Sequence, residues 1–355
     1  MPDVLLISKP IAPPWNDSNK NLVRDLSRGM TRWRPRVLVP RGEALDGVLS
    51  EPVYQSRGAY APARSANVRV LGRLLLGPRT AVWHFFFGPN PTTLRAGALA
   101  SGLRRVPTVH TVASAPDDLE RLTFFADRVV VLSEHTRQRL RHLGDRVVKI
   151  PPAVTAPPVE PSRVEEARRR HGLPARYVLY PGDLEFSRGA ETFVRAASLG
   201  RRPWVWVGAS RPKTHRAREA LGRLQALARD QGAELTWLGE LDDILAVVAG
   251  ASALALPVET LHAKMDWPLV LLEALSYGVP CVVGAGTAAA ELEASGGVTV
   301  VPSGSPEALV HALEALLGDA PATARRALEA QRWVRATCAP AVVARACEAL
   351  YDEVC

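Results

Sequence analysis

Residues 266–280 read DWPLVLLEALSYGVP, and this stretch decides how the second half of the chain folds. Pro268 suits the first turn of a helix, where a backbone N–H would have no intrahelical partner. The apolar run after it predicts a helix over Leu269–Ser276, which a glycine ends, and residues 279–283 then form a strand. Glu273 interrupts the apolar run, and a carboxylate in such surroundings needs a polar partner. The stretch therefore predicts a helix followed by a strand, with one charge of functional interest.

Short apolar runs alternate with helical stretches along the rest of the chain. In the first half, strands are predicted at residues 4–7, 36–39, 81–87, 108–112, 128–132 and 147–150. In the second half, they are predicted at residues 177–180, 204–207, 235–238, 253–256, 279–283 and 298–300. Helices are predicted at 21–30, 92–103, 135–143, 163–171, 191–197, 215–231 and 306–317, and the tail 323–355 forms two more, with Thr323 as an N-cap and Pro340 beginning the last. This alternation is typical of parallel sheets with right-handed crossovers.

Residues 154–162, VTAPPVEPS, are rich in proline and predict a linker between two such series. The fold class is therefore α/β, with two doubly wound Rossmann-like domains. We place an N-terminal domain at 1–160, a C-terminal domain at 161–337, and a terminal helix at 338–355 that packs back on the first domain. Since ligands bind at the carboxyl ends of parallel strands, two sheets that face a central cleft suit a reaction of two substrates.

The composition is that of a soluble globular protein. The 355 residues are 47% apolar and 23% charged, and no run of 18 apolar residues predicts a membrane span. The N-terminus MPDVLLISKP is too short and too soon broken by proline for a signal peptide, so we expect a cytoplasmic protein. Four widely spaced cysteines without a CxxC pair predict neither a disulfide framework nor a zinc site.

The net charge is 44 − 36 = +8, which fits nucleic acid, an anionic membrane surface or an anionic substrate as the partner. Arginine is spread along the chain without a basic stripe interleaved with aromatics, which disfavours nucleic acid. Trp15, Trp33 and residues 85–87 together with the basic charge favour a lipid-linked acceptor and a peripheral contact at the inner membrane surface. The alternative is that these aromatic residues belong to the core.

The start of the predicted helix at Leu269 suits a diphosphate, because its first turn carries unpaired N–H groups and a partial positive charge. Pro268, Leu269 and Val270 are the residues predicted to lie against the phosphates. The carboxylate of Glu273 can accept hydrogen bonds from both hydroxyls of a ribose. The alternative is an amphipathic helix with one outward glutamate.

Residues 266–280 resemble the C-terminal signature of the family 4 retaining glycosyltransferases (glycosyl transferases group 1), which is E-x7-E within GxxLLEAxAxGxPVV. Further family motifs follow in the same order: ADRVVVLS at 126–133, YPGDLEFSRG at 180–189, WLGEL at 237–241, and residues 284–291 and 298–306. The resemblance covers residues 125–320 well and the first 120 loosely.

This resemblance implies a GT-B fold and an enzyme that transfers a hexosyl group from a nucleotide-sugar donor with retention of configuration. It implies no divalent metal and no cofactor beyond the nucleotide-diphosphate sugar, because the helix dipole and basic residues neutralise the leaving diphosphate. In its pattern, Arg188 and Lys213 hold the phosphates and Glu273 holds the ribose. Asp266 and His110 contact the transferred sugar.

Some positions depart from the family pattern. Met265 stands where the first glutamate of E-x7-E belongs, so Asp266 one position later takes that role, with Glu259 as a weaker substitute. Asp183 stands at the family's arginine position, and Arg188 replaces its lysine and can still grip a diphosphate. Lys213, with its neighbour Arg211, supplies the missing charge; the alternative is that both lie on a solvated loop.

In the first domain, residues 13–20, PPWNDSNK, replace the family's Gly-Gly loop. Ser18 and Asn19 are predicted to cap the following helix and to lie near phosphate, with ordinary capping as the alternative. His110, at the end of a predicted strand, matches a family histidine near the transferred sugar, and His84 is a second candidate.

Two other chemistries are disfavoured. Residues 283–289 contain GxGxxA, but the next strand lacks the acidic residue that a dinucleotide site requires. Asp242 and Asp243 read as a helix N-cap and not as a metal-binding DxD. Two rival functions stay open: an inactive homologue that binds nucleotide as a partner protein, and a nucleotide-sugar 2-epimerase. The acceptor, a small molecule, a glycan or a lipid-linked sugar, is not specified by the sequence.

Overall fold

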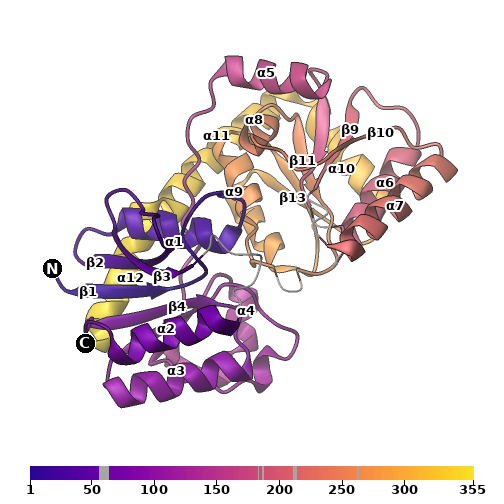
Figure 1. Cartoon of the computed structure of the whole chain (residues 1–355). Coiled ribbons are helices and arrows are strands. Elements are labelled where there is room, and N and C mark those ends of the chain that lie inside the picture. The colour runs from indigo at the N-terminus through magenta and orange to yellow at the C-terminus, as the bar shows by residue number, and fades with distance from the viewer. Residues whose placement is uncertain (56–63, 183, 186–187, 211–213, 262–263) are drawn as a thin grey trace. The chain divides into compact units, whose positions relative to one another are not determined.

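The computed structural model describes residues 1–55, 64–182, 184–185, 188–210, 214–261 and 264–355. Its contacts divide the chain into two compact units. Unit 1 comprises Met1–Thr155, the short segment Ala263–Asp266 and Ala336–Cys355, and unit 2 comprises Ala156–His262 and Trp267–Arg335. The sequence predicts the boundaries at 160/161 and 337/338 instead. Figure 1 shows the elements of both units.

Unit 1 contains a parallel sheet with the strand order β3-β2-β1-β4-β5-β6-β7. The strands are β1 (Asp3–Ile7), β2 (Arg34–Pro40), β3 (Leu49–Tyr54), β4 (Val82–Phe87), β5 (Thr108–Val112), β6 (Arg128–Val131) and β7 (Val147–Lys149). Its central strands are almost wholly buried, as in β5, where every residue is. Continuous apolar runs of this kind are expected of strands that are covered on both faces.

Helices cover both faces of the unit 1 sheet (Figure 1). The described helices are α1 (Ser18–Gly29), α2 (Arg64–Leu76), α3 (Pro91–Arg104), α4 (Glu134–Arg139) and α12 (Pro340–Val354), with short 3₁₀ turns η1 (Leu119–Arg121) and η2 (Arg141–Arg146). α2 and α3 pack against one another, and Leu74 and Ala100 enter a core cluster with Leu5 and Trp83. α12 packs against α1, and the buried Glu348 on α12 accepts hydrogen bonds from three consecutive backbone N–H groups that follow α1.

Unit 2 contains a second parallel sheet, with the strand order β10-β9-β8-β11-β12-β13. The strands are β8 (Tyr177–Tyr180), β9 (Val205–Ala209), β10 (Leu235–Leu238), β11 (Ala253–Leu256), β12 (Cys281–Gly284) and β13 (Val298–Val301). The helices are α5 (Pro161–His171), α6 (Gly189–Ser198), α7 (His215–Asp230), α8 (Ile244–Ala249), α9 (Leu269–Ser276), η3 (Ala288–Ser295), α10 (Pro306–Gly318) and α11 (Ala320–Cys338). α6 packs against α7 and α10, whereas α8 packs against α5 and α9, so helices form two groups around this sheet.

The alternation of strands and helices predicted from sequence is confirmed in both units, and each sheet is doubly wound. Two elements of unit 1 were missed. β3 contains Pro52 and lies at the sheet edge with most of its residues partly exposed, so its apolar pattern is weak. α2 contains Gly72 and carries no acidic residue in its first turn, so it lacks common helix signals.

The predicted N-cap at Thr323 is wrong. α11 begins at Ala320, and the Asp319 carboxylate accepts a hydrogen bond from the N–H of Ala322 at 2.9 Å. The Thr323 hydroxyl instead donates to the carbonyl of Leu316. The predictions that Pro340 begins the last helix and that Asp243 is an N-cap are confirmed.

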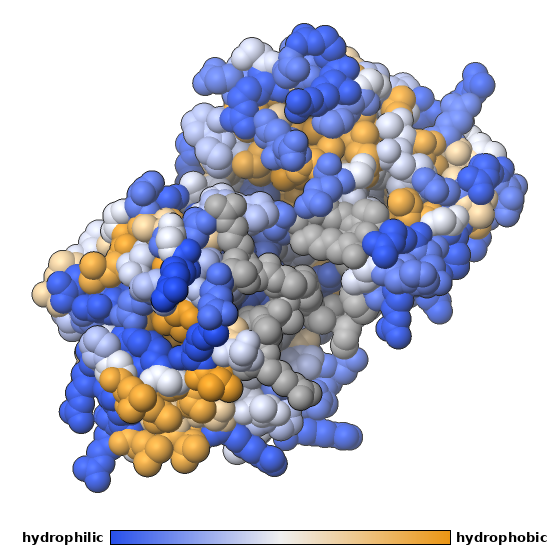
Figure 2. All heavy atoms as spheres, in the orientation of Figure 1, coloured by the Kyte–Doolittle hydropathy of each residue, from blue (hydrophilic) through white to orange (hydrophobic). Residues whose placement is uncertain are grey.

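Hydrophilic side chains cover most of the molecular face in Figure 2. Among the residues that the structure describes, no helix has both the length and the apolar character to cross a bilayer.

Candidate functional site

The start of α9 lies where the sequence predicted a phosphate site. α9 follows β11 and runs back along the sheet before β12, so its N-terminus lies at the carboxyl edge of the unit 2 strands. Pro268 occupies the N-cap position and provides no side-chain hydrogen bond, although its carbonyl accepts from the N–H of Leu271 at 2.9 Å. Leu269 is buried and Val270 is half-buried. Their backbone N–H groups therefore belong to a helix start whose N-cap residue, Pro268, provides no side-chain cap.

Glu273 lies in the second turn of α9 and is half-buried. Burial, with the charge of Glu273 adding to it, raises the pKa of Tyr277 to about 12. The Tyr277 hydroxyl donates to the carbonyl of Pro157 at 2.9 Å. Glu273 is thus a half-buried acidic residue on a helix whose other residues are mostly buried. Its partial exposure is compatible with binding the hydroxyl groups of a ligand.

Arg188 occupies the N-cap position of α6 and is exposed. The next residue, Gly189, packs tightly on the loop after β11, because a Cβ there would lie 2.7 Å from Val258 Cγ1 and 3.0 Å from Val258 Cα. Gly284, at the end of β12, approaches the same loop, since a Cβ there would lie 2.4 Å from the carbonyl oxygen of Val258. Both glycines therefore pack closely against the loop at Val258, at the carboxyl edge of the sheet, and Arg188 directly precedes the first of them.

Glu259 and Glu185 are two further acidic residues of unit 2. Glu259, the weaker substitute for the missing glutamate, lies close to Gly304, whose Cβ would be 3.0 Å from the Glu259 carboxylate. Thr214 caps α7 and donates a hydrogen bond to Glu185 at 2.9 Å. Lys213, Arg211 and Asp183 lie outside the described residues, so their predicted roles stay predictions.

In unit 1, the loop after β1 places a charged pair at the start of α1. Asp17 is the N-cap: its carboxylate accepts from the N–H groups of Asn19 at 3.0 Å and Lys20 at 3.3 Å, and from Lys9 Nζ at 2.8 Å. Burial opposes ionisation, but Lys9 and the two backbone donors hold the pKa of Asp17 below its ordinary value. The prediction that Ser18 and Asn19 cap this helix is therefore wrong.

Ser18 is instead the exposed first residue of α1. Asn19 reaches from α1 to the end of β4, where its side-chain amide donates to the carbonyl of Phe86 at 3.1 Å. Its buried amide oxygen has no hydrogen-bond partner among the described residues. An unpaired buried acceptor is costly, so this oxygen marks Asn19 as a position that a ligand donor would stabilise.

His110 lies on β5 and is fully buried among aromatic rings, with the Phe87 ring centroid 4.4 Å away. Burial lowers its pKa to about 4, so the ring is neutral at pH 7. Nε2 lies 3.1 Å from the Phe87 carbonyl and must donate there, which leaves Nδ1 as the acceptor. Nδ1 is buried and has no partner among the described residues. His110 can therefore accept a hydrogen bond but does not provide a positive charge.

His84 has both ring nitrogens engaged inside unit 1. Nδ1 lies 2.6 Å from the Tyr351 hydroxyl and Nε2 lies 2.7 Å from Thr111 Oγ1. Burial holds its pKa well below the ordinary value. These contacts attach α12 to the sheet, so they support a structural role.

Asp266 is buried in unit 1, and Ser133 Oγ donates to its carboxylate at 2.5 Å. Ser133 follows β6 and caps α4, since its Oγ also accepts from the N–H of Thr136 at 3.0 Å. Met265, the residue at the family's glutamate position, is buried as well. Ser133 is the last residue of the family motif at 126–133, but nothing in the sequence indicates that it contacts Asp266.

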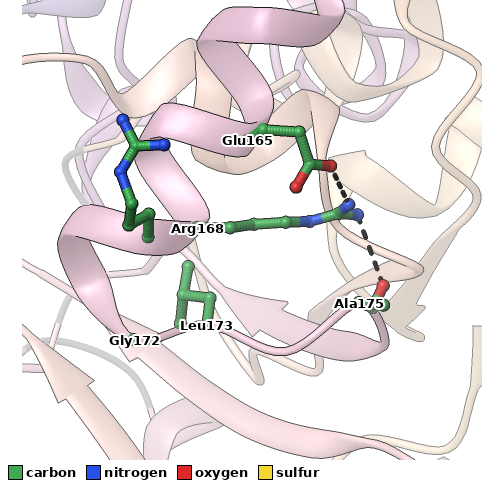
Figure 3. Close-up of a pocket in the computed structure, with 6 residues that line it drawn as sticks. Glu165, Arg168, Gly172, Leu173 and Ala175 are labelled. Carbon is green, nitrogen blue, oxygen red and sulfur yellow. Dashed lines mark hydrogen bonds and ion pairs between the residues drawn. The ribbon is translucent and has the colours of Figure 1, made fainter.

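The described residues contain two hollows but no metal-binding cluster. Among the described residues, no group of three or more His, Cys, Asp or Glu side chains could hold a metal ion. A hollow of about 460 Å³ lies beside α5, where Arg168 pairs with Glu165 and donates to the carbonyl of Ala175 (Figure 3). A second, of about 470 Å³, lies between β13, α10 and α11. Neither is lined by a residue that the sequence predicted to bind a ligand.

Comparison with known proteins connects unit 2 to one family. Residues 175–319 match the family model of the glycosyl transferases group 1. No protein with curated annotation matches the sequence significantly.

Solved structures resemble the whole chain. HepE of Anabaena, in complex with UDP and glucose, has a TM-score of 0.77 at 16% identity, with 99% of this chain and 100% of HepE covered. Sucrose-phosphate synthase of Thermosynechococcus elongatus has a TM-score of 0.73 at 18% identity, with 99% of each chain covered. WaaG, a glycosyltransferase involved in lipopolysaccharide biosynthesis, has a TM-score of 0.65 at 17% identity, with 99% of each chain covered.

At such low identities these likenesses establish the fold, which is the GT-B fold of two Rossmann-like domains. The family match to residues 175–319 lies in the C-terminal part of the chain.

Proposed function

We propose that this chain is a glycosyltransferase that moves a hexosyl group from a nucleotide-sugar donor to an acceptor, with retention of configuration and without a divalent metal ion. The observation that carries the proposal is the carboxyl edge of the unit 2 sheet. The start of α9 at Pro268, the half-buried Glu273 and the exposed Arg188 lie on elements that begin at this edge. The group 1 family match covers all of these residues.

The residues of unit 2 supply what a leaving nucleoside diphosphate requires. Arg188 can donate two parallel hydrogen bonds to phosphate oxygens, and Lys213 is proposed as the second cation. The N–H groups at Leu269 and Val270 add the partial positive charge of the α9 terminus. Glu273 accepts from the two ribose hydroxyls. Stabilising the charge that develops on the leaving diphosphate would be the main catalytic contribution.

The residues of unit 1 are proposed to contact the sugar and the acceptor. Asp266 accepts hydrogen bonds from sugar hydroxyls while Ser133 orients its carboxylate. His110, neutral at pH 7, accepts a hydrogen bond through Nδ1. Asn19 presents its unpaired amide oxygen at the start of α1.

Nucleotide binding tests the donor site. Glu273→Ala and Arg188→Ala should each weaken UDP binding in calorimetry by about an order of magnitude or more. Glu191→Ala and Arg195→Ala on α6 are matched controls, because these residues form an exposed ion pair at 2.8 Å that contributes little. Wild-type affinity in both site variants would reject the assignment.

Three further measurements address the finer claims. EDTA should leave transfer intact, and loss of activity that added Mg²⁺ restores would reject metal independence. The anomeric configuration of the product, read by NMR, should match that of the donor. A thermal-shift screen of UDP, GDP, ADP and dTDP sugars would identify the donor base.

One rival function has a specific observation in its favour. Met265 is buried and apolar at the position where the family has a glutamate, which favours an inactive homologue that binds nucleotide as a partner protein. Retained UDP binding without turnover of any donor would support this rival. Incubating donor without acceptor distinguishes a 2-epimerase from a transferase, since only an epimerase then makes a new sugar.

We further propose a cytoplasmic location and a peripheral contact with the inner membrane surface. The acceptor classes that fit are a small molecule, a glycan and a lipid-linked sugar. The basic charge of the chain supports the membrane contact.

A further inference from the structure

Helices α2 and α3 expose large aliphatic side chains to solvent. Val68 and Leu76 on α2 are 68% and 88% exposed, and Leu99 and Leu103 on α3 are 60% and 66% exposed. The two residues on α3 are four apart and those on α2 are eight apart, so each pair lies along one side of its helix. Figure 2 shows hydrophobic side chains gathered at the lower left, over α2 and α3. We define these four residues as the α2–α3 face.

The ends of α2 and α3 are fixed to one another, so this face is held in place. The Arg104 guanidinium, at the end of α3, donates to the carbonyls of Leu75 and Gly77, the latter at 3.0 Å. Leu76 and Leu103 are the immediate chain neighbours of these bonded residues. Burying a leucine from water is favourable, so a rigid edge with two such residues exposed indicates a surface that another apolar phase covers.

The excess of basic over acidic residues arises in the stretch that contains α2 and α3. Residues 52–116 contain eight arginines and no Lys, Asp or Glu. The rest of the chain then holds 44 − 8 = 36 basic and 36 acidic residues, so the whole net charge of +8 comes from this stretch. The arginines are Arg57, Arg64, Arg69, Arg73, Arg79, Arg95, Arg104 and Arg105. Arg79, Arg95 and Arg105 are exposed on or directly beside α2 and α3, whereas Arg57 lies outside the described residues.

We propose that the α2–α3 face docks on an anionic lipid bilayer. Its leucines would enter the boundary between headgroups and acyl chains, and Arg79, Arg95 and Arg105 would contact lipid phosphates, which is the arrangement typical of interfacial binding. A second copy fits less well, because the same face would bring Arg79, Arg95 and Arg105 of one copy toward those of the other. The inference deepens the proposed membrane contact, on which it rests, and is independent of sugar transfer.

Co-sedimentation of the full chain with vesicles tests the inference. Vesicles of phosphatidylcholine mixed with phosphatidylglycerol should bind the chain, binding should fall as salt is raised, and vesicles of phosphatidylcholine alone should bind it weakly. Equal binding to both vesicle types, or binding to neither, would overturn the proposal.

Matched variants locate the surface. Arg79→Gln/Arg95→Gln/Arg105→Gln should lower the vesicle partition coefficient on the order of 100-fold, since each arginine near an anionic surface contributes about fivefold. Arg216→Gln/Arg223→Gln/Arg229→Gln on α7 removes the same charge from exposed positions of unit 2 and should have little effect. An equal loss in both triple variants would mean that net charge alone governs binding, and would overturn the assignment of the face.

Leucine variants test the apolar part. Leu76→Ser/Leu103→Ser should lower partitioning about 10-fold or more, whereas Leu199→Ser/Leu328→Ser changes two other exposed leucines and should not.

Sedimentation velocity without lipid should show one species for every variant. A dimer that Leu76→Ser/Leu103→Ser dissociates would assign the face to a second copy. Calorimetry with UDP on the same variants keeps the two proposals apart, because loss of vesicle binding should leave nucleotide affinity unchanged.

Discussion

Replacing Ser133 with alanine removes two buried hydrogen bonds at once. Ser133 Oγ donates to the Asp266 carboxylate at 2.5 Å and accepts from the Thr136 N–H at 3.0 Å, and all three residues are at most 5% exposed. A hydrogen bond to a buried carboxylate contributes about 1.5–3 kcal/mol. Loss of a serine N-cap costs about 1 kcal/mol. Ser133→Ala should therefore lower the free energy of unfolding by about 3 kcal/mol.

Ser305→Ala is the matched control for this experiment. Ser305 caps α10 through a bond from the Ala308 N–H at 3.2 Å, which is the same capping interaction as at α4. Urea denaturation followed by circular dichroism should give a loss of about 1 kcal/mol for this variant. The difference between the two serine variants isolates the bond to Asp266. A Ser133→Ala variant no less stable than Ser305→Ala would refute the reasoning.

The same pair of residues also tests the proposed function. If Ser133 positions Asp266 against the sugar, Ser133→Ala should lower kcat while calorimetric UDP affinity stays as in the wild type, because the proposed nucleotide residues lie on α6 and α9 of unit 2. Asp266→Asn keeps an oxygen for Ser133 to donate to and should lower kcat further. Unchanged kcat in both variants would assign the pair a structural role only.

Two further predictions concern buried groups. Burial holds the pKa of His110 at about 4, below its ordinary value of 6.5. Between these pH values the imidazole is protonated in the unfolded chain but neutral in the folded chain. The contribution of this group to stability is therefore complete above pH 6.5 and falls by about 3 kcal/mol as the pH falls to 4. Urea denaturation should show this loss in the wild type and a smaller one in His110→Gln, and identical pH profiles would contradict it. Gly189→Ala places a Cβ 2.7 Å from Val258 Cγ1 and should cost about 1–3 kcal/mol, whereas Gly222→Ala on α7, with open space around it, should be neutral or stabilising. If thermal unfolding gives equal midpoints for the two glycine variants, the tight contact at Val258 is absent.

Local patterns were enough to predict most elements of both sheets. α9 begins and ends at the predicted residues, as do β5 and β10, because each is an apolar run between turn or helix-ending residues. β3 was missed because an edge strand needs little apolar pattern of its own: it is defined by pairing with β2.

The start of α1 shows where local signals stop being sufficient. Asp17, Ser18 and Asn19 all have side chains that suit an N-cap, so the sequence alone does not choose among them. The structure selects Asp17, whose carboxylate also pairs with Lys9, the second residue after β1. Asn19 is turned instead toward β4, 67 residues away in the chain.

The sequence by itself determined the doubly wound α/β class and the helix at Leu269–Ser276 with its one glutamate. These features depend on residue types and short spacings, which the chain carries locally. Only the tertiary structure decided that Ser133 contacts Asp266, 133 residues further on, and that burial makes His110 neutral. It also decided that leucines of α2 and α3 stay exposed. Partners, burial and exposure depend on which distant segments the fold brings together, and no spacing along the chain encodes them.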